Sequence, residues 1–240
     1  MARRLPVLLG LTALAALAVP ATSAQAATPL CFGKPATIVG TAGPDNLVGQ
    51  SGVSDVIYAG GGNDTVLGGD FYSEDDVPGA APDLLCGGPG DDTVYGGPGN
   101  DKINGGDGND HVDGRLGADI VQGDAGDDRV SDQSFEDMDG ANDVLRGGTG
   151  NDQITTAWGV DKAYGDAGND TIIDLECSTS YLYGGPGADT FESYWSSFDG
   201  AYCNSSKDFI DGNDGTDRAK ASRADSVLHV ESVQRITAAY

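Results

Sequence analysis

The sequence predicts an all-β solenoid, in which short strands pair in parallel with their counterparts one coil away. The first observation is a nine-residue unit, Gly-Gly-x-Gly-x-Asp-x-U-x with U apolar, that repeats through most of the 240-residue chain. The second is the placing of its glycines, which allow tight turns that other residues resist. The third is the end of each unit, where an apolar, often β-branched residue lies between two mostly polar neighbours, as in a short strand. A fixed period of this kind is typical of repeat architectures.

The repeat is most regular in the middle of the chain. Copies follow one another without interruption from Gly87 to Ser131, and others begin at Gly147, Gly165, Gly184 and, in weakened form, Gly212. Each unit supplies one turn and one short strand, and that strand has no partner within its own unit. Two units, or 18 residues, can close one flattened right-handed coil with a strand on each side. Residues 40–220 then make about ten coils, with strands about 4.8 Å apart.

The apolar U residues should form a thin ladder inside this stack. They are Leu47, Ile57, Val66, Leu85, Val94, Ile103, Val112, Val121, Val130, Leu145, Ile154, Ala163, Ile172, Leu182, Phe191, Ile210 and Ala219. One buried apolar residue contributes about 1.5–3 kcal/mol, whereas ordering each backbone residue costs about 1–2 kcal/mol. One apolar residue in nine is therefore too few to fold the array unaided.

The charges indicate what else stabilises it. The chain has 38 acidic and 13 basic side chains and a formal net charge of −25, which argues against nucleic acid as a partner. The acids keep a fixed phase relative to glycine and the apolar residue, so they favour cation binding over a solvated acidic tail. Oxygen-rich turns with no Cys or His ligand suit a hard cation, and calcium accepts their flexible coordination better than magnesium does.

At these residues the chain resembles the repeats-in-toxin, or hemolysin-type calcium-binding, family, whose signature is this nonapeptide. The resemblance covers about residues 40–220 and implies a parallel β-roll. It also implies calcium between the turns of successive coils, held by turn carbonyls and by the position-six carboxylates. In this chain those residues are Asp45, Asp55, Asp64, Asp83, Asp92, Asp101, Asp110, Asp119, Asp128, Asp143, Asp152, Asp161, Asp170, Asp189, Asp208 and Asp217.

The pattern also lapses in places. Ser180 replaces the position-six aspartate in one unit, so that turn should bind calcium weakly or not at all. Ala163 and Ala219 thin the apolar ladder. The longer interruptions, at residues 71–82, 132–142 and 193–206, are expected to bulge as loops between coils.

Both ends of the chain differ from the repeats. Residues 1–26 read as a signal peptide, because two arginines precede the apolar run Leu5–Val19 and a small-x-small motif follows it. That run is too short for a membrane span, so we expect a secreted protein. Residues 27–39 are expected to form an N-terminal cap, and residues 221–240 a C-terminal capping strand.

The even number of cysteines in an exported chain favours two disulfides. Cys31–Cys86 and Cys177–Cys203 are the preferred pairs because each is local along a stacked array, although the sequence leaves all three connectivities open.

The sequence therefore favours a secreted, monomeric calcium-binding repeat protein whose folding is coupled to binding many calcium ions. It is not expected to be an enzyme, because it lacks HExxH and GxSxG and has only two histidines. The alternatives are a β-helical carbohydrate-active enzyme or lectin, and a surface adhesin that uses calcium structurally. A cell-surface or polysaccharide partner stays open, as does the role of the aromatic residues in the 193–206 loop.

Overall fold

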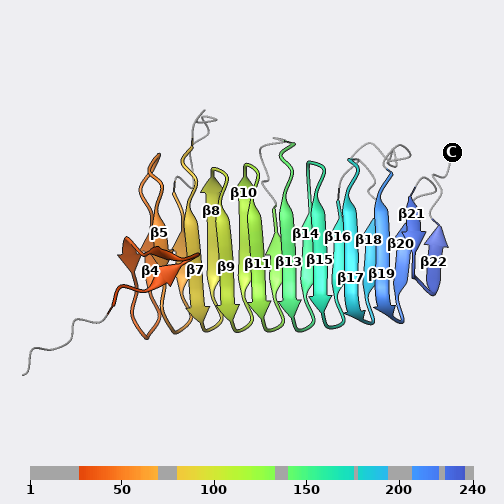
Figure 1. Cartoon of the computed structure of the whole chain (residues 1–240), viewed down its shortest axis with the longest axis horizontal. Helices are drawn as coiled ribbons and strands as arrows, with labels where there is room; N and C mark the ends of the chain where they lie inside the picture. Colours follow the sequence, from red (N-terminus) through yellow and green to blue (C-terminus); the bar gives the residue numbers. More distant parts are fainter. Residues whose placement is uncertain are drawn as a thin grey trace, which may run out of the picture.

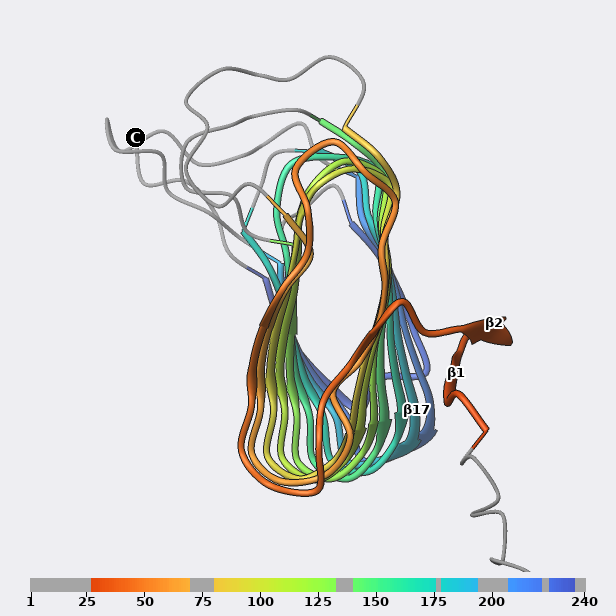
Figure 2. The same cartoon turned by 90° about the vertical axis from the view of Figure 1, so that its left-hand side faces the viewer.

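Parallel strands are the main secondary structure in the computed structural model of the chain. It describes residues 27–69, 80–132, 140–175, 178–193, 207–221 and 225–235, and none of these residues is helical. Two ten-stranded sheets face each other along the molecule, and a two-stranded hairpin lies beside one end of the stack (Figures 1 and 2). We call the sheets the odd sheet and the even sheet after the numbers of their strands.

The odd sheet contains β3 (Ile38–Val39), β5 (Val56–Tyr58), β7 (Leu84–Pro89), β9 (Lys102–Asp107), β11 (Ile120–Ala125), β13 (Val144–Thr149), β15 (Lys162–Ala167), β17 (Tyr181–Gly187), β19 (Phe209–Gly215) and β21 (Ser226–Leu228). The even sheet contains β4 (Asn46–Val48), β6 (Thr65–Leu67), β8 (Thr93–Pro98), β10 (His111–Leu116), β12 (Arg129–Ser131), β14 (Gln153–Thr156), β16 (Thr171–Asp174), β18 (Thr190–Ser193), β20 (Arg218–Ala221) and β22 (Ser232–Arg235).

The chain alternates between the two sheets, so each odd strand and the even strand after it make one coil. Neighbours within a sheet pair in parallel, and the repeat sets their register: Val112 pairs with Val94 on one side and with Val130 on the other. The ten strands per sheet confirm the predicted parallel β-roll of about ten coils.

The apolar ladder lies between the sheets, as the sequence predicts. Its members from Ile57 to Ala219 are at most 3% exposed, and Leu47 packs against them at the N-terminal end. Ile38, Val227 and Val230 extend the same core beyond the predicted ladder. The core therefore consists of two facing rows of side chains, one row from each sheet.

The two edges of the roll are built differently. At the edge where odd strands lead to even strands, every connection is short, as in residues 87–92 and 105–110; we call it the regular edge (bottom of Figure 1). At the other edge, the variable edge, even strands lead to odd strands through connections of unequal length. The internal stretches outside the described residues (70–79, 133–139, 176–177, 194–206 and 222–224) all belong to this second set of connections.

The N-terminal end of the stack carries the hairpin. Its strands β1 (Leu30–Cys31) and β2 (Lys34–Pro35) pair antiparallel, and both turn residues, Phe32 and Gly33, have positive φ, as in the two-residue turns that suit hairpins. A disulfide joins Cys31 to Cys86 on β7, which confirms one predicted pair. Cys177 and Cys203 lie outside the described residues.

The C-terminal stretch that was expected to form one capping strand contains two. β21 pairs with β19 and β22 pairs with β20, both in parallel, so this stretch adds a coil of its own. The expected signal peptide, residues 1–26, lies outside the described residues. Within the described part of the chain, no helix has the length and apolar character needed to cross a membrane.

Candidate metal sites in the turns

The predicted position-six aspartates form two rows, one at each edge of the roll. The regular edge holds Asp45, Asp64, Asp92, Asp110, Asp128, Asp152, Asp170, Asp189 and Asp217, and the variable edge holds Asp55, Asp83, Asp101, Asp119, Asp143, Asp161 and Asp208. All are buried except Asp45, which is partly exposed. Each lies directly before a strand, two residues ahead of a core residue. Because neighbouring strands pair in register, the aspartates of successive coils lie next to one another.

In each row, one carboxylate oxygen of every aspartate after the first helps to join the coils. Oδ1 of Asp110 accepts a hydrogen bond of 2.7 Å from the backbone N–H of Asp92, and Oδ1 of Asp128 accepts one of 2.7 Å from that of Asp110. The same bond recurs along the regular edge from Asp45 to Asp217. On the variable edge it runs from Asp55 to Asp161. In every case the amide belongs to the earlier coil and the carboxylate to the later one.

The other carboxylate oxygen has a different environment. Oδ2 is fully buried and has no hydrogen-bond partner in Asp64, Asp92, Asp101, Asp110, Asp119, Asp128, Asp152, Asp170, Asp189 and Asp217. A buried carboxylate oxygen without a donor is costly, and buried charges are normally paired or bound to a metal. This row of oxygens therefore fits a cation.

Backbone carbonyls line the same turns. A Cβ atom added to Gly106 would lie 2.1 Å from the carbonyl oxygen of Gly88, and one added to Gly108 would lie 2.0 Å from that of Gly90. Both glycines also have positive φ, at 120° and 135°. Glycine is needed here because the carbonyls of one coil face the backbone of the next at close range. The atoms in a turn that could bind a metal are thus carboxylate and carbonyl oxygens, the ligands that calcium prefers.

Burial raises the pKa of these carboxyl groups. The pKa rises to about 6 for Asp92 and to about 7 for Asp110. Loss of hydration is the main cause; the hydrogen bond from the preceding coil lowers the pKa, and nearby aspartates raise it again. On the variable edge, loss of hydration raises the pKa of Asp119 to about 10. The rows therefore hold negative charge at a cost that a bound cation would offset.

Ser180 occupies the place of an aspartate in the variable-edge row, as its position in the repeat predicts. It is buried, and its backbone N–H donates to Oδ1 of Asp208 at 3.0 Å. Its own side chain supplies a hydroxyl in place of a carboxylate, so this coil has one charge fewer. Whether calcium binds there weakly stays a prediction.

Two acidic residues that sequence reasoning missed extend the rows into the last coil. The backbone N–H of Asp217 donates to Oε2 of Glu231 at 2.6 Å, and that of Asp208 lies 3.3 Å from Oδ1 of Asp225. Each acid lies two residues before an apolar residue, Val233 or Val227. This spacing from acid to apolar residue could have identified both acids in the sequence. The glycines that precede the acid in a regular repeat unit are absent here, so the units were not recognised.

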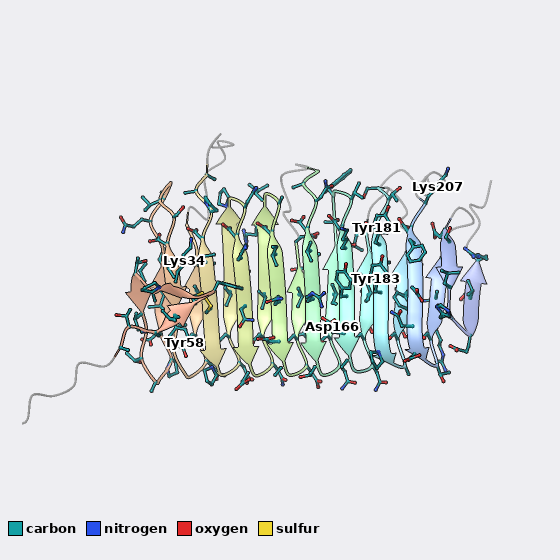
Figure 3. All side chains as sticks on the ribbon, viewed as in Figure 1. Lys34, Tyr58, Asp166, Tyr181, Tyr183 and Lys207 are labelled. Atoms are coloured by element: carbon teal, nitrogen blue, oxygen red, sulfur yellow. A yellow bond between two sulfur atoms is a disulfide. The ribbon has the colours of Figure 1, made fainter. Side chains whose placement is uncertain are left out.

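The aromatic residues of the 193–206 loop, Tyr194, Trp195, Phe198 and Tyr202, lie outside the described residues. A separate aromatic group covers the outer face of the odd sheet, where Tyr181 and Tyr183 lie on neighbouring parts of β17 (Figure 3). Tyr183 stacks on Tyr164 with ring centroids 5.0 Å apart, and the Arg146 guanidinium lies over the Tyr164 ring. These rings pack on one another, as cross-strand pairs on a sheet surface do.

The fold and its turns place the chain in the class of parallel β-solenoids with glycine-rich acidic turns. Four copies of the RTX calcium-binding nonapeptide repeat match it, at residues 39–72, 87–121, 112–131 and 139–172. The chain belongs to this family of calcium-binding repeat proteins. A comparison with curated proteins found no match. The coils from β17 onward continue the register beyond the last matched copy.

Proposed function

We propose that this protein is a secreted calcium-binding roll whose folding is coupled to calcium binding, with the position-six aspartates as its carboxylate ligands. The observation that carries the proposal is the row of buried Oδ2 atoms without a hydrogen-bond donor. The strand register aligns these oxygens in rows only when successive coils are stacked. The open chain offers the same aspartates far apart, so calcium should bind it much more weakly.

Linkage then turns calcium binding into folding free energy. A ligand that binds the folded state and hardly binds the unfolded state stabilises the fold by an amount that grows with the logarithm of its concentration above the dissociation constant. With a net charge of −25, the calcium-free chain also repels itself. Extracellular calcium modules work at dissociation constants of about 10⁻⁴–10⁻³ M, so calcium-poor conditions should favour the open chain and calcium-rich ones the roll.

Export agrees with this mechanism. The expected signal peptide in residues 1–26 and a disulfide between Cys31 and Cys86 both suit an oxidising compartment outside the cytosol. A chain held open by low calcium would be easy to translocate. It would fold where calcium and oxidant are both present.

The experiment is a calcium titration of the chain without residues 1–26, followed by circular dichroism and calorimetry on the same sample. We expect a disordered far-ultraviolet spectrum with chelator and a cooperative gain of β signal as calcium reaches about millimolar concentrations. Magnesium at equal concentration is the control and should restore less structure, because it demands rigid octahedral coordination. A spectrum that does not change with chelator would overturn the coupling.

A further inference from the structure

One buried carboxylate on the variable edge does not belong to the position-six row. Asp132 directly follows β12, two residues after the core residue Val130. Gly114 occupies the same place one coil earlier, two residues after Val112. The sequence pattern assigned Asp132 to a loop between coils, but the structure buries it to 5% exposure.

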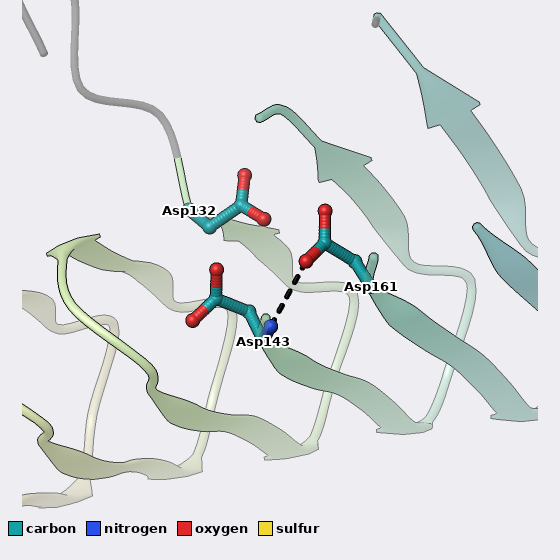
Figure 4. A group of neighbouring side chains, drawn as sticks. All are labelled: Asp132, Asp143 and Asp161. Atoms are coloured by element: carbon teal, nitrogen blue, oxygen red, sulfur yellow. Dashed lines mark hydrogen bonds between the residues drawn. The ribbon is translucent and has the colours of Figure 1, made fainter. Parts of the chain in front are cut away.

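Asp132 reaches two members of the variable-edge row. One carboxylate oxygen from each of Asp132, Asp143 and Asp161 lies within 4.8 Å of the others, and all three residues are buried (Figure 4). The backbone N–H of Asp143 donates to Oδ1 of Asp161 at 2.9 Å, which fixes the Asp161 carboxylate against the backbone of the preceding coil. Two oxygens bound to one calcium ion at about 2.3–2.6 Å lie at most about 5 Å apart. The spacing of the three carboxylates is therefore suitable for a shared ion.

The environment of Asp132 points to such an ion independently of the spacing. Both of its carboxylate oxygens are fully buried without a well-formed hydrogen bond, and the Ala157 amide supplies only the weakest of the interactions that act on them. No lysine or arginine of the described residues forms an ion pair with Asp132. A buried carboxylate with so little compensation for its lost hydration is strongly unfavourable. A cation between the three carboxylates would remove that cost.

The local electrostatics agree with this geometry. Loss of hydration raises the pKa of Asp132 well above its usual range, with further increases from Asp161, Asp143 and Asp113, against a smaller lowering by the Ala157 amide. Burial also raises the pKa of Asp119, and the charges of Asp143 and Asp132 add to that rise. Negative charge is thus concentrated in this part of the variable edge.

We propose that Asp132, Asp143 and Asp161 together hold one calcium ion more tightly than the glycine-rich turns do. Affinity in oxygen-ligand calcium sites rises with the number of charged ligands, and this site has a third carboxylate that comes from outside the repeat's position six. The proposal rests on the proposed function for calcium as the ion, but it assigns a different set of ligands. As the calcium concentration rises, this site should therefore be occupied before those in the glycine-rich turns.

The test is calcium calorimetry on the wild-type protein and on Asp132→Asn. The wild type should show one ion bound at least about 10-fold more tightly than the remaining class, and Asp132→Asn should lose that step while keeping the weaker class. Since asparagine removes an uncompensated buried charge, the calcium-free variant should be no less folded than wild type. Asp132→Gly, which restores the residue found at Gly114, is the second variant and should behave in the same way.

Asp174→Asn is the matched control. Asp174 is buried, lies two residues after a core residue at the same edge, and accepts a hydrogen bond from Thr156 at 3.3 Å. Its substitution should leave the tight step intact. A tight step that persists in Asp132→Asn, or a wild type with a single class of sites, would refute the site while leaving calcium-coupled folding standing. A wild type that binds no calcium would overturn both.

Discussion

The two oxygens of a position-six aspartate have separate tasks. In Asp110, Oδ1 binds the backbone of the preceding coil, whereas Oδ2 is buried without a donor. The hydrogen bond to Oδ1 can form without metal, whereas Oδ2 needs a cation to offset its burial. An asparagine at this position would keep the shape of the side chain and remove its charge. The same substitution should therefore have opposite effects with and without calcium.

We predict that Asp110→Asn lowers the calcium-linked free energy of unfolding by about 1–2 kcal/mol, a factor of about 5–30 in the folding equilibrium. In chelator it should not destabilise the protein, because it removes a desolvated charge. Asp107→Asn is the control, since Asp107 is exposed in the same turn, and it should stay within about 0.5 kcal/mol of wild type. Urea unfolding at fixed millimolar calcium measures both. Equal effects of the two substitutions would mean that the phase of the turn is assigned wrongly.

At the scale of strands and turns, the repeat predicted most of the candidate site. The x-Asp-x-U spacing predicted which aspartates form rows, and the structure brings all sixteen into one or the other edge; their role as calcium ligands stays a prediction. It did not predict Asp132, Asp225 or Glu231. Their positions follow from strand register across coils, and no glycine-rich turn precedes Asp225 or Glu231 in the sequence. Contacts of this kind are set by the stack and not by one unit.

The hairpin is the element that the repeat does not explain, and its disulfide gives it a test. The bond between Cys31 and Cys86 closes a sequence separation of 55 residues. Replacing both cysteines by serine should lower the free energy of unfolding by about 2–4 kcal/mol, mainly by freeing the unfolded chain. Urea unfolding of the calcium-loaded protein measures this loss. An unchanged midpoint would show that the hairpin does not contribute to the stability of the first coils.

Across the whole molecule, the sequence predicted the architecture because the period specifies both the strands and their register. It could not predict that all the irregular connections described above fall at one edge, since that depends on which of the two units in each coil is interrupted. The regular edge keeps its short turns from residues 40–45 to residues 229–231. The variable edge absorbs the insertions, and it is also where the additional carboxylate, Asp132, lies.

The buried rows also predict how the calcium-free protein responds to pH. Burial raises the folded-state pKa of Asp92 to about 6 and of Asp101 to about 7, above an unfolded value of about 3.9. Groups shifted in this direction favour folding below about pH 4, and that contribution is lost as the pH rises through about 6–7. In chelator, the β signal should therefore be greater at pH 5 than at pH 7.5.

With calcium the order should reverse, because protons compete for the same oxygens and the calcium midpoint should rise as the pH falls. Circular dichroism at the two pH values, with and without chelator, gives all four measurements. A chelated protein equally unfolded at both would contradict the burial of these carboxylates.

The direction of the carboxylate-to-amide bonds gives the stack an order of assembly. Each coil presents backbone N–H groups that donate to carboxylates of the following coil, as the N–H of Asp92 donates to Oδ1 of Asp110. A stack that is folded only as far as a given coil therefore ends in backbone N–H groups without acceptors. The next coil supplies carboxylates to these groups and presents new N–H groups of its own. For a chain that emerges from its N-terminus, assembly would advance in one direction, and Asp225 and Glu231 would attach the last coil that the structure describes.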